Sequence, residues 1–259
     1  MEDLKVCLSV IRKFWKSNPY HVLVMSNGLA DGHVVPPECS ALADETIEVP
    51  TNPGHLKGNA ELLKEGIARV ASDCDHVILL EADTWIFTDR IINKYLKRLR
   101  EEKAVWASAE WIEKYNSLGL DFVIADQHFL RANPKIFDFT EHAECYVCNY
   151  LRTHSAKYLF VKECMPTHLP KVVRRFYNPF GGRNRSFSRA LMVTHHIEDL
   201  SGGLAEKKAL ANIVLGRMEF ETPLHINIKK DKLKLRLAET IAKLAPRSKW
   251  IKPKKARKT

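Results

Sequence analysis

The sequence of 259 residues contains no run of about 18 or more apolar residues, the length that a membrane-spanning helix requires. It does not open with the basic and then apolar pattern of a secretory leader. Its six cysteines are scattered without the paired spacing of a disulfide framework, which is typical of proteins from a reducing compartment. We therefore expect a cytoplasmic protein with free thiols, which its C-terminal tail could hold at the periphery of a membrane.

The basic face expected of a nucleic-acid-binding domain is also missing from most of the chain. The formal net charge is +10, from 41 Lys and Arg against 31 Asp and Glu. Residues 229–259 hold 13 of the basic residues and 2 of the acidic ones, a net of +11, which leaves 28 against 29, or −1, for residues 1–228. Because nucleic-acid binding by a folded domain needs basic residues gathered on that domain, we expect no nucleic-acid partner for it; the alternative is a nucleic-acid-associated protein that acts through its basic tail. The charge divides the chain into a domain of residues 1–228 and a basic tail of residues 229–259.

The most informative stretch is the end of a predicted strand followed by two acids. Four apolar residues, Val77 to Leu80, predict a strand buried on both faces, and Glu81 and Asp83 follow it. Acids beside a core are costly unless something compensates them, and a divalent cation often does so. Ligands of open α/β sheets bind beyond the carboxyl ends of strands. The pattern predicts a metal and phosphate site; the alternative is a pair of solvated acids that open a loop.

Strand and helix patterns alternate along the rest of the chain. The first helix, Leu4 to Trp15, is stopped by Asn18-Pro19. Thr88 or Asp89 is expected to cap a later helix. The alternation predicts an α/β fold with a largely parallel central sheet. The expected strands are residues 21–25, 46–49, 77–80, 105–109, 121–125, 157–161 and 190–194, and the further helices are residues 60–70, 89–99, one starting at 133–134, 141–153 and 204–215.

Two glycine-containing loops have the composition of binding loops. Thr51 to Asn59 leads into a helix, and Tyr177 to Arg185 contains two aromatic residues and the arginines Arg183 and Arg185. Loops of this kind are often functional, and these arginines could close over a diphosphate or an acceptor. The alternative for the second loop is a plain solvated loop.

The order of these elements resembles the nucleotide-diphospho-sugar transferases of the GT-A fold, and within them the broad family two of glycosyltransferases. The resemblance extends from about Leu4 to Leu215 and is strongest over Asn52 to Phe87. It implies a Rossmann-like, mostly parallel sheet flanked by helices. It also implies a metal-dependent, inverting transfer of sugar from a UDP- or GDP-sugar to a hydroxyl group of a glycan, protein or lipid-linked acceptor.

The resemblance also assigns roles to particular residues. The acid pair would bind Mn²⁺ or Mg²⁺, with Asp83 as a direct ligand and Glu81 acting through water or ribose, and His195 or His196 would be the late metal ligand. The base and ribose would meet Asn27 and Asp31, and the nucleotide would meet Asn52, His55 and Lys57. The acceptor-side catalytic base would be Glu144, with Glu141 second and Asp126, which follows the strand from Asp121, third.

Two features depart from the family pattern. The family begins with a strand that carries part of the base pocket, whereas this chain starts on the following helix. The acid pair begins with Glu where the family more often has Asp. The alternative function is therefore a catalytically degenerate GT-A-fold protein that binds or scaffolds.

The basic tail combines charge with an apolar stripe. Leu233, Leu237, Ile241 and Leu244 recur at helical spacing among lysines, and Trp250 and a disordered basic end follow. Such a helix can lie on an anionic bilayer surface. The alternative is a domain-packing helix followed by a solubilising basic end.

Overall fold

The computed structural model describes residues 2–112, 117–164, 186–194 and 203–244. The chain forms two compact units, Met1–Lys162 and Glu163–Thr259. The division expected at residue 228 does not coincide with this boundary, because the helix that begins there belongs to the second unit.

The first unit alternates strands and helices, as the sequence predicts. Its mixed α/β composition confirms the broad fold class. The strands are β1 (Leu23–Asn27), β2 (Glu45–Val49), β3 (His76–Leu80), β4 (Trp85–Ile86), β5 (Trp106–Ile112), β6 (Ser117–Asp126) and β7 (Tyr158–Phe160). The helices are α1 (Glu2–Phe14), α2 (Pro37–Ser40), α3 (His55–Arg69), α4 (Arg90–Glu102), α5 (Gln127–Ala132) and α6 (Ala143–Thr153), with 3-10 turns η1 (Leu29–Asp31) and η3 (Pro134–Phe137).

The central sheet has the order β3-β6-β5-β7 and is mixed. Strand β6 is antiparallel to both β3 and β5, whereas β5 and β7 are parallel. The expectation of a largely parallel sheet was wrong. Only four residues separate β5 from β6, and a parallel connection needs a crossover of a dozen or more residues. The chain therefore turns back on itself at this point.

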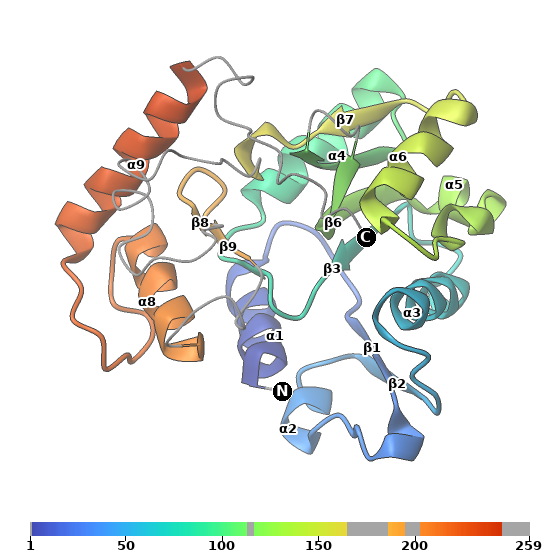
Figure 1. Cartoon of the computed structure of the whole chain (residues 1–259), viewed down its shortest axis with the longest axis horizontal. Coiled ribbons are helices and arrows are strands. Elements are labelled where there is room, and N and C mark those ends of the chain that lie inside the picture. The colour runs from blue at the N-terminus through green and yellow to red at the C-terminus, as the bar shows by residue number, and fades with distance from the viewer. Residues whose placement is uncertain (1, 113–116, 165–185, 195–202, 245–259) are drawn as a thin grey trace, which may run out of the picture. The chain divides into compact units, whose positions relative to one another are not determined.

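Strands β1 and β2 form a separate parallel pair, with Asn27 opposite Val49 at their carboxyl ends. Among the described residues, β1 has no strand neighbour except β2, and β3 has none except β6. Helix α3 lies against both groups. Gly66 of this helix lies against Met25 of β1, and Ile67 belongs to the same apolar cluster as Val77 of β3. Figure 1 shows α3 beside the β1–β2 pair and α6 beside β6.

Helix α1 is fastened to the chain that follows β3. The Trp15 indole Nε1 donates to the Ile86 carbonyl oxygen at 3.0 Å. Asp89 accepts hydrogen bonds from the backbone amides of Lys16 and Ser17 at 2.7 and 2.6 Å, and its side chain makes no capping bond to α4. The expected capping role of Asp89 is therefore corrected: its carboxylate holds the end of α1.

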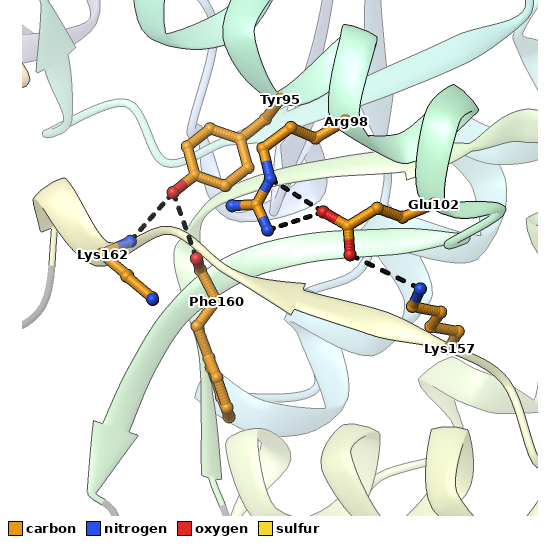
Figure 2. A network of polar contacts seen from close by, with 6 residues as sticks. All are labelled: Tyr95, Arg98, Glu102, Lys157, Phe160 and Lys162. Atoms are coloured by element: carbon orange, nitrogen blue, oxygen red, sulfur yellow. Dashed lines mark hydrogen bonds and ion pairs between the residues drawn. The ribbon is translucent and has the colours of Figure 1, made fainter.

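Helix α4 is joined to β7 by a buried phenol (Figure 2). The Tyr95 hydroxyl donates to the Phe160 carbonyl oxygen and accepts from the Lys162 amide, each at 3.1 Å. Nearby, Arg98 pairs with Glu102 at 2.7 Å, and Lys157 lies 3.4 Å from the same carboxylate. The two bonds of the Tyr95 hydroxyl satisfy the Phe160 carbonyl and the Lys162 amide at the end of β7.

The second unit contains the short antiparallel strands β8 (Ser186–Phe187) and β9 (Met192–Val193) and the helices α8 (Gly203–Leu215) and α9 (Ile228–Leu244). The turn η4 (Lys162–Cys164) lies at the boundary between the units. Helices α8 and α9 pack side by side (Figure 1). The fully buried Asn212 side chain bonds to the backbone of Glu219 and Phe220 and so fixes the loop after α8. No helix in the described ranges is long and apolar enough to span a bilayer.

Candidate functional site

Two asparagines meet where β1 and β2 end. The Asn27 side-chain amide donates to Asn52 Oδ1 at 3.3 Å, and the Gly54 amide donates to the same oxygen at 3.1 Å. Gly28 and Gly54 have φ values of 87° and 98°, in the left-handed region that only glycine adopts without strain. The sequence prediction that Asn27 and Asn52 share a site agrees with this contact.

The N-terminus of α3 opens at the same place. Gly54 precedes the helix and provides no side-chain cap, so the first-turn N–H groups are available to a ligand. His55 and Lys57 lie exposed in this first turn, and the helix dipole adds partial positive charge. An anion such as a diphosphate suits a helix end of this kind.

Gly58 of α3 lies against the side-chain amides of Asn27 and Asn52, and its lack of a side chain makes room for both; we call this region, at the ends of β1 and β2, the β1–β2 corner. A Cβ atom at Gly58 would lie 2.6 Å from Asn27 Nδ2 and 3.0 Å from Asn52 Oδ1. Asp31, in η1, is exposed in the loop that follows β1. The predicted nucleotide residues of this region therefore lie at the end of β1, in the loops after β1 and β2, and in the first turn of α3.

The acid pair follows β3, the strand to which α3 leads. Gly58 lies against Asn27 at the end of β1, whereas Gly66 lies against Met25 further back, so α3 runs antiparallel to β1. Strand β3 then begins at His76, and Glu81 and Asp83 follow its carboxyl end.

The acids occupy a tight turn. The Thr84 amide donates to the Glu81 carbonyl oxygen at 2.9 Å, and the Cys7 thiol of α1 contacts the Thr84 carbonyl oxygen at 3.4 Å. Thr84 is fully buried, whereas Glu81 and Asp83 are half-buried. The turn is thus held in place by the buried Thr84, and its two acids lie at the edge of the sheet where β3 ends.

Sequence reasoning missed a third acid. The Glu81 amide donates to the Asp121 carbonyl oxygen at 3.1 Å, which places these residues opposite each other on β3 and β6. Asp121 is buried, and a Cβ atom at Gly119 would lie 2.9 Å from its Oδ1. The available signal was an acid inside an otherwise apolar strand, which is costly without a compensating partner.

The acceptor-side candidates divide into two groups. The C-terminus of helix α6 leads into β7, whose first residues pair with the start of β5. The N-terminus of α6 therefore points toward the opposite edge of the sheet, where β3 and β5 end. Glu144 is half-buried in the first turn of α6, and Glu141 is exposed just before it. Burial and the nearby Glu144 carboxylate raise the pKa of Cys145.

Asp126 does not belong to this edge. It lies opposite His76 at the amino end of β3, and its side chain accepts from the Phe129 amide at 2.7 Å as the cap of α5. Because β6 runs antiparallel to β3, the end of β6 is the far end of the sheet from Glu81. The sequence-based choice of Asp126 as a catalytic base is corrected on this ground.

Four predicted residues, Arg183, Arg185, His195 and His196, lie outside the described residues. In the described ranges, no group of three or more His, Cys, Asp and Glu side chains is arranged to hold a metal ion. The predicted metal set therefore stays a prediction.

Comparison of the chain with models of protein families, with curated proteins and with solved structures found no match.

Proposed function

We propose that this protein is a metal-dependent glycosyltransferase of GT-A type that moves a sugar from a UDP- or GDP-sugar to a hydroxyl acceptor with inversion. One observation carries the proposal. The Asn27–Asn52 amide pair, the uncapped N-terminus of α3 and the acid turn from Glu81 to Thr84 each lie at the carboxyl end of one of the strands β1, β2 and β3, or in the segment that follows it. Open α/β sheets bind ligands beyond these ends of their strands.

The donor's nucleotide part would occupy the β1–β2 corner. Side-chain amides offer both a donor and an acceptor to a base or a ribose, and Asp31 offers a carboxylate to ribose hydroxyls. The diphosphate would meet the N-terminus of α3 with His55 and Lys57. Space for this approach is supported by Gly54, where a Cβ atom would meet nothing within 4 Å.

The chemistry of the acid turn fits a hard divalent cation. Carboxylate oxygens are the ligands that Mg²⁺ and Mn²⁺ take, and Glu81 and Asp83 of the turn and Asp121 of β6 are the carboxylates that would be available to one. Asp83 would ligate directly, with His195 or His196 and the donor phosphates completing the set. When bound, the cation would offset the charge that develops on the departing diphosphate.

Glu144 would hold the proton that the acceptor hydroxyl loses, with Glu141 as second candidate. An inverting transfer needs one carboxylate on the acceptor side, opposite the leaving group. Glu144 lies on α6, a different element from the acid turn. Arg183 and Arg185 would close over the diphosphate or the acceptor.

Release of UDP or GDP from a panel of sugar nucleotides, with Mn²⁺ and without acceptor, tests the proposal. We expect slow metal-dependent release that Asp83→Ala abolishes. Glu144→Gln should retain nucleotide binding and lose transfer once an acceptor is known. Equal release by the unsubstituted protein and by Asp83→Ala would contradict the proposal.

A degenerate binding or scaffold protein is the second candidate. The observation that favours it is that β1 has β2 as its one strand neighbour in the described part of the chain, so this side of the base pocket lacks a strand wall. Such a protein would show no metal-dependent release and no metal-dependent nucleotide binding.

A further inference from the structure

Helix α9 presents leucines to solvent instead of packing them. Leu233 and Leu237 are 69% and 53% exposed, whereas Leu235 and Ala238 are 1% and 0% exposed. Residues four apart lie on one face of a helix, so the two exposed leucines form an adjacent pair. The helix packs on α8 through the face of Leu235 and Ala238, as the alternative of a domain-packing helix predicts, and not through the face that holds Leu233 and Leu237. Of the remaining stripe, Ile241 is half-buried, and the side chain of Leu244 lies outside those described.

The inner face of α9 is firmly held in the second unit. Glu239 accepts hydrogen bonds from the backbone amide and the hydroxyl of Ser188 at 2.6 and 2.5 Å. Lys232 donates to the Leu215 carbonyl oxygen at the end of α8, at 2.8 Å. These bonds fix which face of α9 points outward, so the exposure of the leucine pair is a property of the folded unit.

Basic side chains surround the exposed pair. Lys229, Lys230 and Arg236 are exposed on this side of α9, and in the described part of the chain none of them pairs with a carboxylate. Lys234, by contrast, lies 3.4 Å from Asp231. The outward face thus combines two leucines with three uncompensated cations.

A shallow depression beside this face gathers further positive charge. It is lined by Gly216, Ile228, Lys229, Lys232, Leu233 and Arg236. Burial and the neighbouring Arg236 charge lower the pKa of Lys232. Such mutual repulsion is relieved when an anionic group enters, and a phosphate has the size and charge to do so.

We propose that the outward face of α9 is a docking surface for an anionic lipid bilayer, with Leu233 and Leu237 entering the interface and Lys229, Lys230 and Arg236 contacting lipid phosphates. Amphipathic helices bind in this way when an apolar pair is flanked by basic residues. The inference does not depend on the proposed transferase activity. It concerns the second unit alone.

A bilayer suits this surface better than a protein partner. Two copies of the chain would bring like charges together across the leucine pair, which opposes self-association. Leu237 stands exposed on the outward face of the helix and Leu233 at the depression beside it, so the pair matches a deformable interface. The sequence continues the positive charge through residues 245–259, which contain seven Lys and Arg and no acid. An extended anionic surface can engage all of it.

The test is flotation of the full chain with vesicles of phosphatidylcholine, with or without about 30% phosphatidylserine. The unsubstituted protein should float with the anionic vesicles only. Leu233→Ser combined with Leu237→Ser should weaken binding about tenfold, and alanine at Lys229, Lys230 and Arg236 about a hundredfold. Matched controls are Val34→Ser, another exposed apolar residue, and Lys94→Ala with Lys97→Ala on α4, which should bind normally.

Three outcomes would overturn the proposal. The first is no flotation of the unsubstituted protein. The second is flotation that the leucine substitutions leave unchanged, since that would reduce the contact to charge alone. The third is concentration-dependent dimerisation, measured by light scattering, that the leucine substitutions abolish while vesicle binding persists. Thermal unfolding should be unchanged in every variant, because each altered side chain is exposed.

Discussion

The Glu81 amide donates to the Asp121 carbonyl oxygen across β3 and β6, so the first acid of the turn faces a buried acid on the neighbouring strand. The proposed cation site includes the acid turn, and the place of Asp121 opposite Glu81 makes Asp121 a residue to test.

Asp121→Asn should weaken Mn²⁺ binding about tenfold, since one charged oxygen ligand is lost at constant size. Mn²⁺ affinity, measured by electron paramagnetic resonance of the free ion, checks this. Asp126→Asn is the matched control at the far end of β6. It should leave Mn²⁺ affinity unchanged. Similar affinities for the Asp121 variant and the unsubstituted protein would remove Asp121 from the site.

Gly58→Ala should weaken UDP or GDP binding about tenfold. Alanine is normally favoured over glycine inside a helix by about 1 kcal/mol, but here its Cβ would lie 2.6 Å from Asn27 Nδ2. The amide pair must move to admit it. Gly66→Ala, in the same helix, is the control, because its Cβ would meet only the flexible Met25 side chain at 3.3 Å and should leave nucleotide binding intact. Titration calorimetry of both variants tests this prediction, and equal losses of nucleotide affinity would contradict the assignment of Gly58 to the nucleotide site.

Asp89→Asn should lower the free energy of unfolding by about 1–2 kcal/mol at neutral pH. Burial alone would raise the pKa of Asp89, but the hydrogen bonds from Lys16 and Ser17 outweigh it and lower that pKa. The stabilisation is therefore complete above the ordinary carboxyl pKa of about 3.9 and is lost as the pH falls through the lower folded-state pKa. Urea unfolding from pH 7 to pH 3 should show the two proteins converging in acid. A constant difference across that range would disprove the role of this carboxylate.

Tyr95→Phe should destabilise the first unit by about 1–3 kcal/mol, because the Phe160 carbonyl and the Lys162 amide both lose their partner. Tyr146→Phe is the control: its hydroxyl donates to the Lys135 carbonyl oxygen at 3.0 Å in an exposed position, where water replaces it. Thermal unfolding of the two variants should differ clearly. Equal small effects would show that the bonds drawn in Figure 2 do not fasten α4 to β7.

The strands and the first helices of the first unit could be predicted from the sequence, because the spacing of their apolar residues is regular and helix-breaking residues mark their ends. The apolar run Val77 to Leu80 predicted β3, and Asn18-Pro19 predicted the end of α1. The direction of β6 was missed because periodicity does not reveal which way a strand runs. The connection from β5 was the available signal, since it is too short for a crossover.

The candidate site was predictable where a residue type and a strand end coincide, as for Asn27 and Asp83. Asp121 was missed because it lies inside a strand, and its place beside Glu81 depends on register. Asp126 was misplaced for the same reason, since an antiparallel strand carries its last residue to the opposite edge. The outward leucines of α9 could not be assigned to a side from their spacing, which is the same for a packed stripe and an exposed one.

Calorimetric titration of UDP and of GDP into the purified protein, with and without Mn²⁺ and alongside Asp83→Ala, tests the central claim most directly. We expect binding of one nucleotide that requires Mn²⁺ and disappears in the variant. Absence of binding to both nucleotides, or binding that neither Mn²⁺ nor the substitution alters, would contradict the transferase assignment.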